Sequence, residues 1–351
     1  ETAHPNFADY VKPAALDERA FRPGPRPQFP RAATSFLGFL RPAGRGVGTR
    51  NYLVILPLSS QVNAFARALE QRLREIPNAQ PVKGAFDGVV ALPHTEDGMA
   101  ATTHTSVHSQ EAGAANRSLL LRTLVGLITH PNVGAAILLE GAQGSAGVQG
   151  VGVDYAAITD AASALNHSER LRTTPHTVVP VALHGFEAEL QAGTRAAADL
   201  LPQVRITRRS SCAASTLSVA QQCGGSDAFS GTAANPLLAD ASKMVVEAGG
   251  AALLAETDEL IGAEQYVLQN VRDFSTAERF LQLVGRFRRY AADHHTSAEG
   301  NPSGGNMLRG LYNIALKSLG AAMKRHPAVR LERVVEYGER LPGPVLDEEA
   351  Q

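Results

Sequence analysis

The chain has 351 residues, enough for two ordinary domains with a sizeable buried core. Apolar residues make up 44% and charged residues 19%, the range of a soluble globular protein, and the formal net charge is −1. This balance gives no electrostatic reason to expect nucleic acid or an anionic membrane as a partner.

The cysteine content and the hydropathy favour a cytoplasmic enzyme. Two cysteines, Cys212 and Cys223, are too few for a disulfide framework or a zinc site of the CxxC…CxxC type. No apolar run approaches the ~20 residues needed to span a bilayer. Residues 1–30 lack the charged and apolar regions of a secretory signal. We therefore expect a cytoplasmic location and neither a membrane nor a nucleic-acid partner.

Residues 1–35 are rich in proline and lack apolar periodicity, which predicts an extended arm. In the segment that follows, 36–205, short apolar runs predict buried strands, and apolar side chains at helical spacing predict helices. The predicted strands are 51–58, 86–93, 133–140 and 176–183, and the predicted helices are 63–76, 118–130 and 186–200. This alternation predicts a parallel, layered α/β domain. Ligands bind such sheets at the carboxyl ends of the strands.

A second α/β domain is predicted over 206–351. Its expected elements are a glycine-rich loop at 223–231, a helix at 235–248, a strand at 251–256 and a longer amphipathic helix at about 276–292. On that last helix, Phe280, Val284 and Phe287 share one stripe, which is typical of a core-facing surface. The expected fold class is therefore α/β, with two layered units and mainly parallel sheets.

Two motifs in the first domain have candidate chemistry. GRGVGTRN (44–51) places Arg50 before the first strand, where it could grip a carboxylate in a bidentate pair, although a tight turn with a surface arginine is the commoner meaning. His94 directly follows a strand, a good position for a catalytic group. His104 and His108 have the i, i+4 spacing of metal ligands, but without the glutamate of the metalloprotease motif this signal is weak.

The most informative stretch is CGGSDAFSG (223–231). Two adjacent glycines would let backbone amides approach a ligand closely, while Ser226 and Asp227 could bind its hydroxyls or a metal. A β-turn in a connector has a similar composition. GNPSGGNMLRG (300–310) adds amide side chains in another loop, and Lys317 opens a helical segment.

Together these motifs resemble one family. GVGTRNYLVILP, DGVVALPHT, HPNVGAAILL, QCGGSDAFSGTAANPLLADAS, GGAALLAETDELIGAEQ, NPSGGN and KSLGA occur in the order seen in altronate and galactarate dehydratases. That family includes the large subunit of sulfolactate sulfo-lyase. The resemblance runs from about residue 38 to residue 338, and its CGGSD and ETDE stretches are highly specific.

The resemblance implies a lyase that removes water, or another group β to a carboxylate, from a polyhydroxy acid. A base takes the α-proton, and an electrophile, commonly iron in this family, helps the β-hydroxyl leave. We expect His94 or Lys317 to transfer protons and Arg50 to bind the carboxylate. The expected substrate-binding residues are Asn51, Thr95, Gln61, Gln143, Gly224, Gly225, Ser226, Asp227, Ser230, Asn235, Asn301 and Asn306. Family positions without an assigned role are Cys223, Glu256, Glu259, Glu264 and Ser318.

The chain departs from the family at the expected metal ligands. The family carries cysteines in three further loops, where this sequence has Gln61, Gly98 and Gln143. Met307 replaces a family lysine. Losing three thiols removes soft ligands for iron. We therefore expect no cofactor and no metal site.

The family also has an N-terminal antifreeze-like domain and a glycine-rich C-terminal segment that this sequence does not contain. We therefore expect a homo-oligomer or a small partner subunit with an antifreeze-like domain, and a small hydroxy acid as substrate. Loops at 94, 143 and 223–231 are expected to meet in one cleft near a domain junction at 200–210. Three hypotheses remain: a hydro-lyase, a repurposed metal-independent enzyme, or a non-catalytic subunit.

Overall fold

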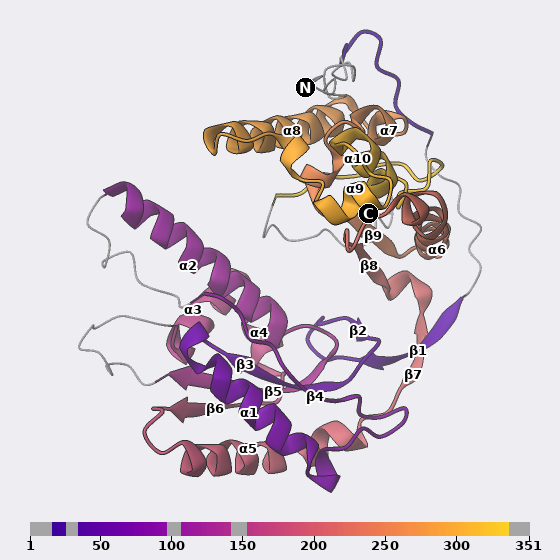
Figure 1. Cartoon of the computed structure of the whole chain (residues 1–351). Coiled ribbons are helices and arrows are strands. Elements are labelled where there is room, and N and C mark those ends of the chain that lie inside the picture. The colour runs from indigo at the N-terminus through magenta and orange to yellow at the C-terminus, as the bar shows by residue number, and fades with distance from the viewer. Residues whose placement is uncertain (1–15, 26–33, 97–106, 142–152, 337–351) are drawn as a thin grey trace. The chain divides into compact units, whose positions relative to one another are not determined.

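The structure, a computed structural model, describes residues 16–25, 34–96, 107–141 and 153–336, without the side chains of 107–113. The chain divides into two compact units (Figure 1). One, here called the sheet unit, is Ser35–Cys212. The other, here called the helical unit, is Ala213–Gln351 together with Glu1–Thr34.

A four-stranded sheet of order β4-β3-β5-β6 forms the centre of the sheet unit. Its strands are β3 (Tyr52–Pro57), β4 (Gly88–Ala91), β5 (Val133–Gly141) and β6 (His176–Val181). All three pairings are parallel, with Val54 beside both Val90 and Ala136. The α/β prediction is confirmed, and each of these strands lies within a predicted apolar run or extends one by a single residue.

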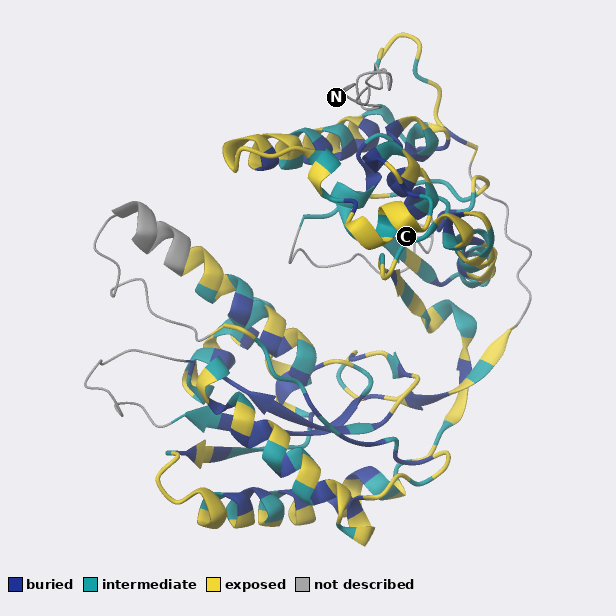
Figure 2. Cartoon of the chain, viewed as in Figure 1, coloured by how far each residue is buried: buried dark blue, intermediate teal, exposed yellow. Residues whose placement is uncertain are grey.

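Helices cover both faces of this sheet. One core packs α1 (Asn63–Arg74) and α5 (Phe186–Ile206) against Leu53 and Ile55. The other packs α2 (Val107–Ile128), α3 (Tyr155–Ala164) and α4 (Ser168–Arg172) against Val54 and Leu56. Successive strand residues point to opposite faces, so β3 is buried on both sides, as Figure 2 shows in dark blue.

A smaller sheet of order β2-β1-β7 flanks this core, formed by β1 (Ser35–Leu40), β2 (Val47–Gly48) and β7 (Ser210–Ala213). The loop between β1 and β2 inserts Arg45, whose guanidinium donates to the carbonyls of Thr129, His130 and Val133 at 3.1, 2.9 and 2.7 Å. A cation suits this place because the carbonyls at the end of α2 lack helical partners. Burial lowers the pKa of Arg45 to about 10, so the side chain remains charged at neutral pH.

The helical unit contains the predicted strand and helices, but its sheet is small. In its described part, one parallel pair, β8 (Ser218–Gln221) with β9 (Ala251–Leu254), is accompanied by helices. These are α6 (Asn235–Glu247), α7 (Glu264–Leu268), α8 (Phe274–Asp293), α9 (Gly304–Leu308) and α10 (Ile314–Ala322), with short helices Ala214–Thr216, Thr257–Leu260 and Ala298–Gly300. Helices α8 and α10 bury Phe280, Val284 and Ile314 in one core, which confirms the predicted stripe. The amphipathic helices of this unit thus pack their apolar faces mainly against one another.

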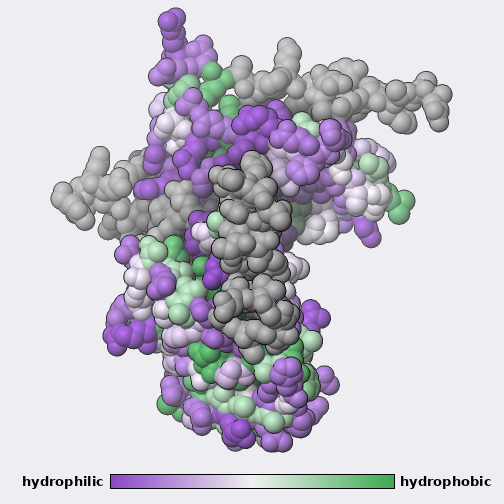
Figure 3. Space-filling model, turned by 90° about the vertical axis from the view of Figure 1, so that its left-hand side faces the viewer, coloured by the Kyte–Doolittle hydropathy of each residue, from purple (hydrophilic) through white to green (hydrophobic). Residues whose placement is uncertain are grey.

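The described part of the proline-rich segment packs on the helical unit. Gly24 N–H donates to the Val271 carbonyl at 2.8 Å, and the rings of Phe21 and Phe274 meet edge to face at 5.8 Å. Elsewhere on the surface, small hydrophobic patches are interspersed among hydrophilic side chains on the face shown in Figure 3. Within the described residues, no helix combines the length and apolar character that a bilayer span requires.

Candidate active site

The CGGSD loop leads directly into a helix, and two of its polar residues start that helix. Ser230 N–H donates to Asp227 Oδ1 at 2.5 Å, and Asp227 N–H donates to Ser230 Oγ at 3.1 Å. This reciprocal pair is a capping box, which satisfies amides that have no partner within the helix. The side chains of Asp227 and Ser230, which we expected to bind substrate, are therefore engaged in capping.

The same helix contains a π-helical turn, Ser230–Ala234, that lies against α10. A Cβ on Gly231 would be 3.2 Å from Gly320 Cα, a tight contact that would push the two helices slightly apart. Asn235 Nδ2 donates to the Gly320 carbonyl at 2.8 Å and ties the two helices together. Asn235, another expected substrate ligand, thus has a packing role here, and π-helical turns are frequent at functional sites.

Glu256 anchors the beginning of the CGGSD loop. Its Oε2 accepts the Cys223 N–H at 2.5 Å, and its Oε1 accepts Gln222 Nε2 at 3.1 Å. Glu256 has a φ of +67°, a strained conformation for a residue other than glycine. Beyond this anchor, Cys223 Sγ lies 2.8 Å from Ser226 Oγ. Nothing lies within 4 Å of a Cβ placed on Gly224 or Gly225, so the loop is open to a ligand on that side.

Lys317 is buried in a polar cluster. Its side chain, on α10, donates to Glu259 Oε1 at 3.3 Å and to the Asn301 amide oxygen. Asn301 Nδ2 also donates to Glu259 Oε1, at 3.2 Å. Lys317 is only 8% exposed, and the second oxygen of Glu259 is buried without a hydrogen-bond partner. A buried ion pair with an unsatisfied oxygen costs stability, which favours a functional reason for its presence.

Asn306 connects this cluster to the CGGSD loop. It forms a capping box with Ser303 at the start of α9, and its Nδ2 donates to the Ser226 carbonyl at 2.8 Å. Hydrogen bonds therefore link four segments that are far apart in the sequence. We call this set the polar ring; its members are Cys223, Ser226, Glu256, Glu259, Asn301, Asn306 and Lys317. No role was expected for Glu256 and Glu259 from the sequence, although the ETDE stretch that contains them is one of its most specific motifs.

The electrostatics of the ring are dominated by carboxylates. Burial raises the pKa of Asp258, and the negative charges of Glu259 and Glu256 raise it further. Lys317 and a backbone hydrogen bond oppose this shift. Three carboxylates thus act electrostatically on one another around the buried lysine, an arrangement typical of sites that handle protons.

In the sheet unit, His94 lies beyond the carboxyl end of β4, as expected. Its Nε2 is 2.8 Å from the Pro57 carbonyl, which can only accept, so Nε2 carries a proton. Its Nδ1 accepts the Glu96 N–H at 3.2 Å. Both ring nitrogens are therefore engaged, and proton transfer by His94 stays a prediction that requires one of these bonds to open.

Two further expected ligands lie near His94. Thr95 Oγ1 donates to Glu96 Oε1 at 3.3 Å. Gln61 lies in the short helix Ser60–Val62, and its side chain is exposed. The helix is held beside the His94 loop because Ser60 N–H donates to the Glu96 carbonyl at 2.8 Å. Gln143, Gly98 and His104 lie outside the described residues. The expected common cleft joins residues of both units, so it also stays a prediction.

Arg50 and Asn51 lie at the amino edge of the sheet, away from His94. Asn51 is 0% exposed and its Nδ2 donates to the carbonyls of Ala85 and Val204 at 2.6 and 2.9 Å, so substrate binding by this side chain stays a prediction that requires these bonds to open. Arg50 pairs with Asp87 at 3.2 Å. A six-residue strand, β3, separates this edge from the carboxyl edge, and such a strand is about 20 Å long. Arg50 and His94 thus lie at opposite edges of the sheet, and carboxylate binding by Arg50 stays a prediction.

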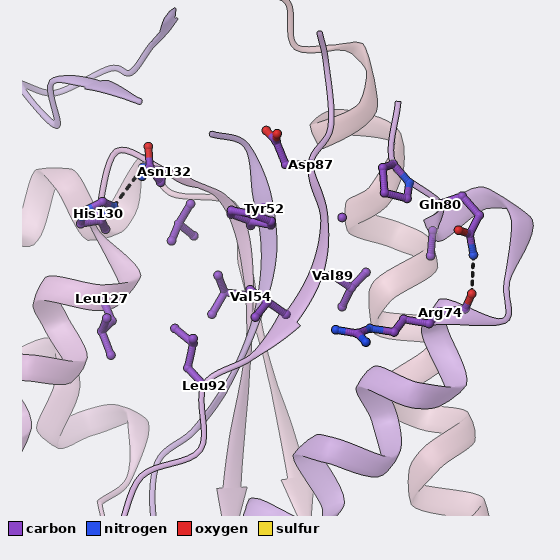
Figure 4. A pocket seen from close by; sticks show the side chains of 15 residues that line it. Tyr52, Val54, Arg74, Gln80, Asp87, Val89, Leu92, Leu127, His130 and Asn132 are labelled. Atoms are coloured by element: carbon purple, nitrogen blue, oxygen red, sulfur yellow. Dashed lines mark hydrogen bonds between the residues drawn. The ribbon is translucent and has the colours of Figure 1, made fainter. Parts of the chain in front are cut away.

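A cavity of about 730 Å³ runs along the edge strand β4 (Figure 4). Apolar side chains of β3, β4 and α2 line most of it, and Arg74, Gln80, Asp87, His130 and Asn132 add polar groups. Burial, and then the nearby charge of Arg45, lower the pKa of His130. No expected catalytic residue lines this cavity, so its size alone does not make it the active site.

Among the residues that the structure describes, no three His, Cys, Asp or Glu side chains come together as metal ligands. The Cys223 thiol lies 2.8 Å from the Ser226 hydroxyl, and hydroxyls are poor substitutes for thiolate ligands.

Comparison with known proteins agrees with these motifs. Residues 38–205 match the family model described as D-galactarate dehydratase/Altronate hydrolase, second domain, and residues 214–347 match D-galactarate/Altronate dehydratase, C-terminal. Altronate dehydratase of Escherichia coli (strain K12) is 30% identical over 95% of this chain and 61% of its own length. The (2R)-sulfolactate sulfo-lyase subunit beta of Chromohalobacter salexigens is 28% identical over 89% of this chain and 70% of its own.

Galactarate dehydratase (L-threo-forming) of Escherichia coli (strain K12) is 28% identical over 63% of this chain and 41% of its own length. The chain thus spans about three fifths of the altronate dehydratase that it matches. The two family models follow one another along the chain and include every segment of the polar ring. The chain belongs to the altronate/galactarate dehydratase family.

Proposed function

We propose that this protein is a lyase that eliminates water from a hydroxy carboxylic acid, with its reaction centred on the polar ring. The observation that carries the proposal is the ring itself. It joins the CGGSD, ETDE, NPSGGN and KSLGA segments through hydrogen bonds around a buried lysine. Relatives named as altronate and galactarate dehydratases support the reaction class.

In this reaction a base removes the proton on Cα, and the electron pair of that bond forms the double bond to Cβ. The Cβ–O bond breaks, and the hydroxyl leaves as water after gaining a proton. From a 2,3-dihydroxy acid the product is an enol, which becomes a 2-oxo acid. Negative charge develops on the carboxylate during proton loss, so a nearby cation or amide donor lowers the barrier.

Residues of the ring suit these tasks. Lys317 is the proton-transfer candidate, and the open amides of Gly224 and Gly225 with the Ser226 hydroxyl are the substrate-binding candidates. Asn301 and Asn306 hold Lys317 and the loop in place. His94 remains the second proton-transfer candidate. We also propose that catalysis needs no tightly bound iron, because the sequence keeps only Cys223 of the family's cysteine positions.

The loss of three family thiols also supports a second candidate, a repurposed enzyme that uses the same scaffold on another acid. For assembly, we propose a second polypeptide or a homo-oligomer. The support is that a relative is named as subunit beta of a sulfo-lyase, which implies a further subunit in that enzyme.

The direct test incubates the full chain with altronate, galactarate and (2R)-sulfolactate in deuterated water. A 2-oxo acid carrying deuterium at C3 is expected from a dehydration substrate, and NMR detects it. Lys317→Met should lower turnover by about 100-fold or more, as for loss of a proton-transfer group. Glu247→Gln is the control, because it removes a half-buried carboxylate that is paired with Lys243 on α6 and lies outside the polar ring. Binding of these acids without turnover by the wild-type chain would favour a non-catalytic subunit.

A further inference from the structure

We propose that Glu259 is a positioning residue that holds Lys317 as an ammonium ion, so that Lys317 donates a proton to the leaving hydroxyl and is not the base. This inference rests on the proposed lyase function. It assigns the direction of proton transfer at Lys317 and a role to a carboxylate outside the expected site.

The geometry of the pair supports this direction. Lys317 Nζ lies 3.3 Å from Glu259 Oε1, and the two side chains are 9% and 12% exposed. Asn301 turns its amide oxygen toward the lysine and its amide nitrogen toward the glutamate. An amide oxygen can only accept, so both partners of Lys317 require it to donate. A neutral amine would satisfy neither as well as an ammonium does.

The charges around Lys317 also favour its ammonium form. The segment that contains Glu259 also contains Glu256 and Asp258, and the charges of Glu259, Glu256 and Lys317 all act on the Asp258 carboxyl. From the other packed elements, Glu299 accepts the Ile314 N–H at the start of α10. Glu264 on α7 is paired with Arg288 at 2.6 Å. Negative charge in a poorly hydrated setting favours the charged form of a buried amine.

A lysine that already carries its proton cannot accept the one on Cα. In the step proposed here, a bond from Lys317 Nζ to hydrogen breaks and an O–H bond forms at the β-hydroxyl. The Cβ–O bond then breaks and water leaves, while the Cα proton passes to a separate imidazole or carboxylate base. Transfer of a proton from solvent restores the ammonium, so the cycle is balanced without an oxidant or a metal.

Nitrogen-15 labelling of lysine tests the charge state without relying on activity. The chain has five lysines, so the Nζ signal of Lys317 can be assigned by its loss in Lys317→Arg. In the wild-type full chain, the ammonium signal of Lys317 is expected to persist to higher pH than in Glu259→Gln. Asn301→Ala should also lower the pH to which the ammonium signal persists, but by less than Glu259→Gln does. A neutral amine in the wild type at pH 7, or an unchanged titration in both variants, overturns the proposal.

Kinetics test the role in the reaction. Glu259→Gln should lower kcat by about 10-fold to 100-fold with little change in KM, and should move the alkaline limb of the pH profile to lower pH. Glu259→Asp, which keeps the charge, should recover part of the rate, and Glu247→Gln should match the wild type. A purely structural role for Glu259 predicts lower stability without a change in the pH profile.

The two proposals fail in different ways. If the wild-type chain turns over none of the three acids, the lyase function fails, and the catalytic role of Lys317 fails with it. The labelling experiment then still shows whether Glu259 holds an ammonium. If the acids are turned over but the alkaline limb is unchanged in both Glu259→Gln and Asn301→Ala, the lyase function stands and the role of Glu259 is wrong.

Discussion

Glu256 accepts the backbone N–H of Cys223 at 2.5 Å, across 33 positions of sequence, while its own backbone has a φ of +67°. The left-handed conformation brings the carboxylate back toward the glycine-rich loop. Backbone strain of this kind costs about 1–3 kcal/mol and persists only where the surrounding structure holds the residue in place. Here the reason is the placement of Cys223 and the two glycines that follow it.

Two substitutions of Glu256 separate strain from anchoring. Glu256→Ala keeps the strain and removes the anchor, whereas Glu256→Gly removes both. We expect the alanine variant to be less stable than the glycine variant by about 1 kcal/mol, because glycine adopts positive φ freely. Both variants should raise KM for the substrate. Thermal unfolding and steady-state kinetics measure this, and equal stability of the two variants would contradict the strain argument.

Asp227 should behave as a helix cap and not as a catalytic carboxylate. Its Oδ1 accepts the Ser230 N–H at 2.5 Å, so Asp227→Ala should lower the free energy of unfolding by about 1 kcal/mol. Asp227→Asn keeps a capping oxygen and should retain most of the stability and activity. Chemical denaturation and turnover of the two variants provide the test. Loss of turnover in a fully folded Asp227→Asn protein would instead support the expected role of this residue in substrate binding.

The contact between Gly231 and Gly320 should not tolerate a side chain. In Gly231→Ala the new Cβ meets Gly320 Cα at 3.2 Å, and separating the helices should cost about 1–3 kcal/mol. Gly224→Ala is the matched control, since nothing lies within 4 Å of its Cβ position. The control should change stability by less than about 0.5 kcal/mol and should weaken substrate binding instead. Similar destabilisation by both variants would disprove this packing explanation.

Stability should depend on pH through Asp273, which caps α8. Burial raises its pKa, but hydrogen bonds from Thr276, Arg272 and Ser275 outweigh this and hold the pKa well below its ordinary value. An unfolded aspartate titrates near ~3.9, so the stabilisation is complete above that pH and is lost as the pH falls toward the folded value. Asp273→Asn should therefore be clearly less stable than the wild type at pH 7. The difference in the free energy of unfolding between the two proteins should shrink below about pH 3, as measured by urea denaturation. A difference that stays constant with pH would show that Asp273 is not responsible.

Iron analysis of anaerobically prepared protein tests the metal-independent chemistry. Of the two cysteines in the chain, Cys212 is buried in β7 and Cys223 lies in the polar ring. Neutral amides at Gln61 and Gln143 are poor ligands for iron. We expect substoichiometric iron and turnover that survives treatment with a chelator. Stoichiometric iron that is lost together with activity in Cys223→Ala would establish the opposite.

The sequence by itself determined the elements and the family. Apolar periodicity is local, so β3, β5, α1 and α8 could be located from residues that are neighbours in the chain. From the sequence, Asp227 and Ser230 were expected to bind substrate, and their capping box is seen only in the structure. Motif order was enough to identify the altronate/galactarate dehydratase family, since order and spacing survive at 28–30% identity.

Only the tertiary structure decided which polar residues are free for chemistry. Asn51 and Lys317 both matched family motifs, yet Asn51 is buried between carbonyls 34 and 153 residues away. Lys317 acquires its charge environment from Glu259, 58 residues earlier. In the helical unit the sequence predicted the strand at 251–256 but missed its parallel partner β8, because strand pairing depends on contacts between distant segments. Burial and hydrogen bonding depend on contacts between distant segments, and side-chain chemistry is set by those contacts more than by residue type.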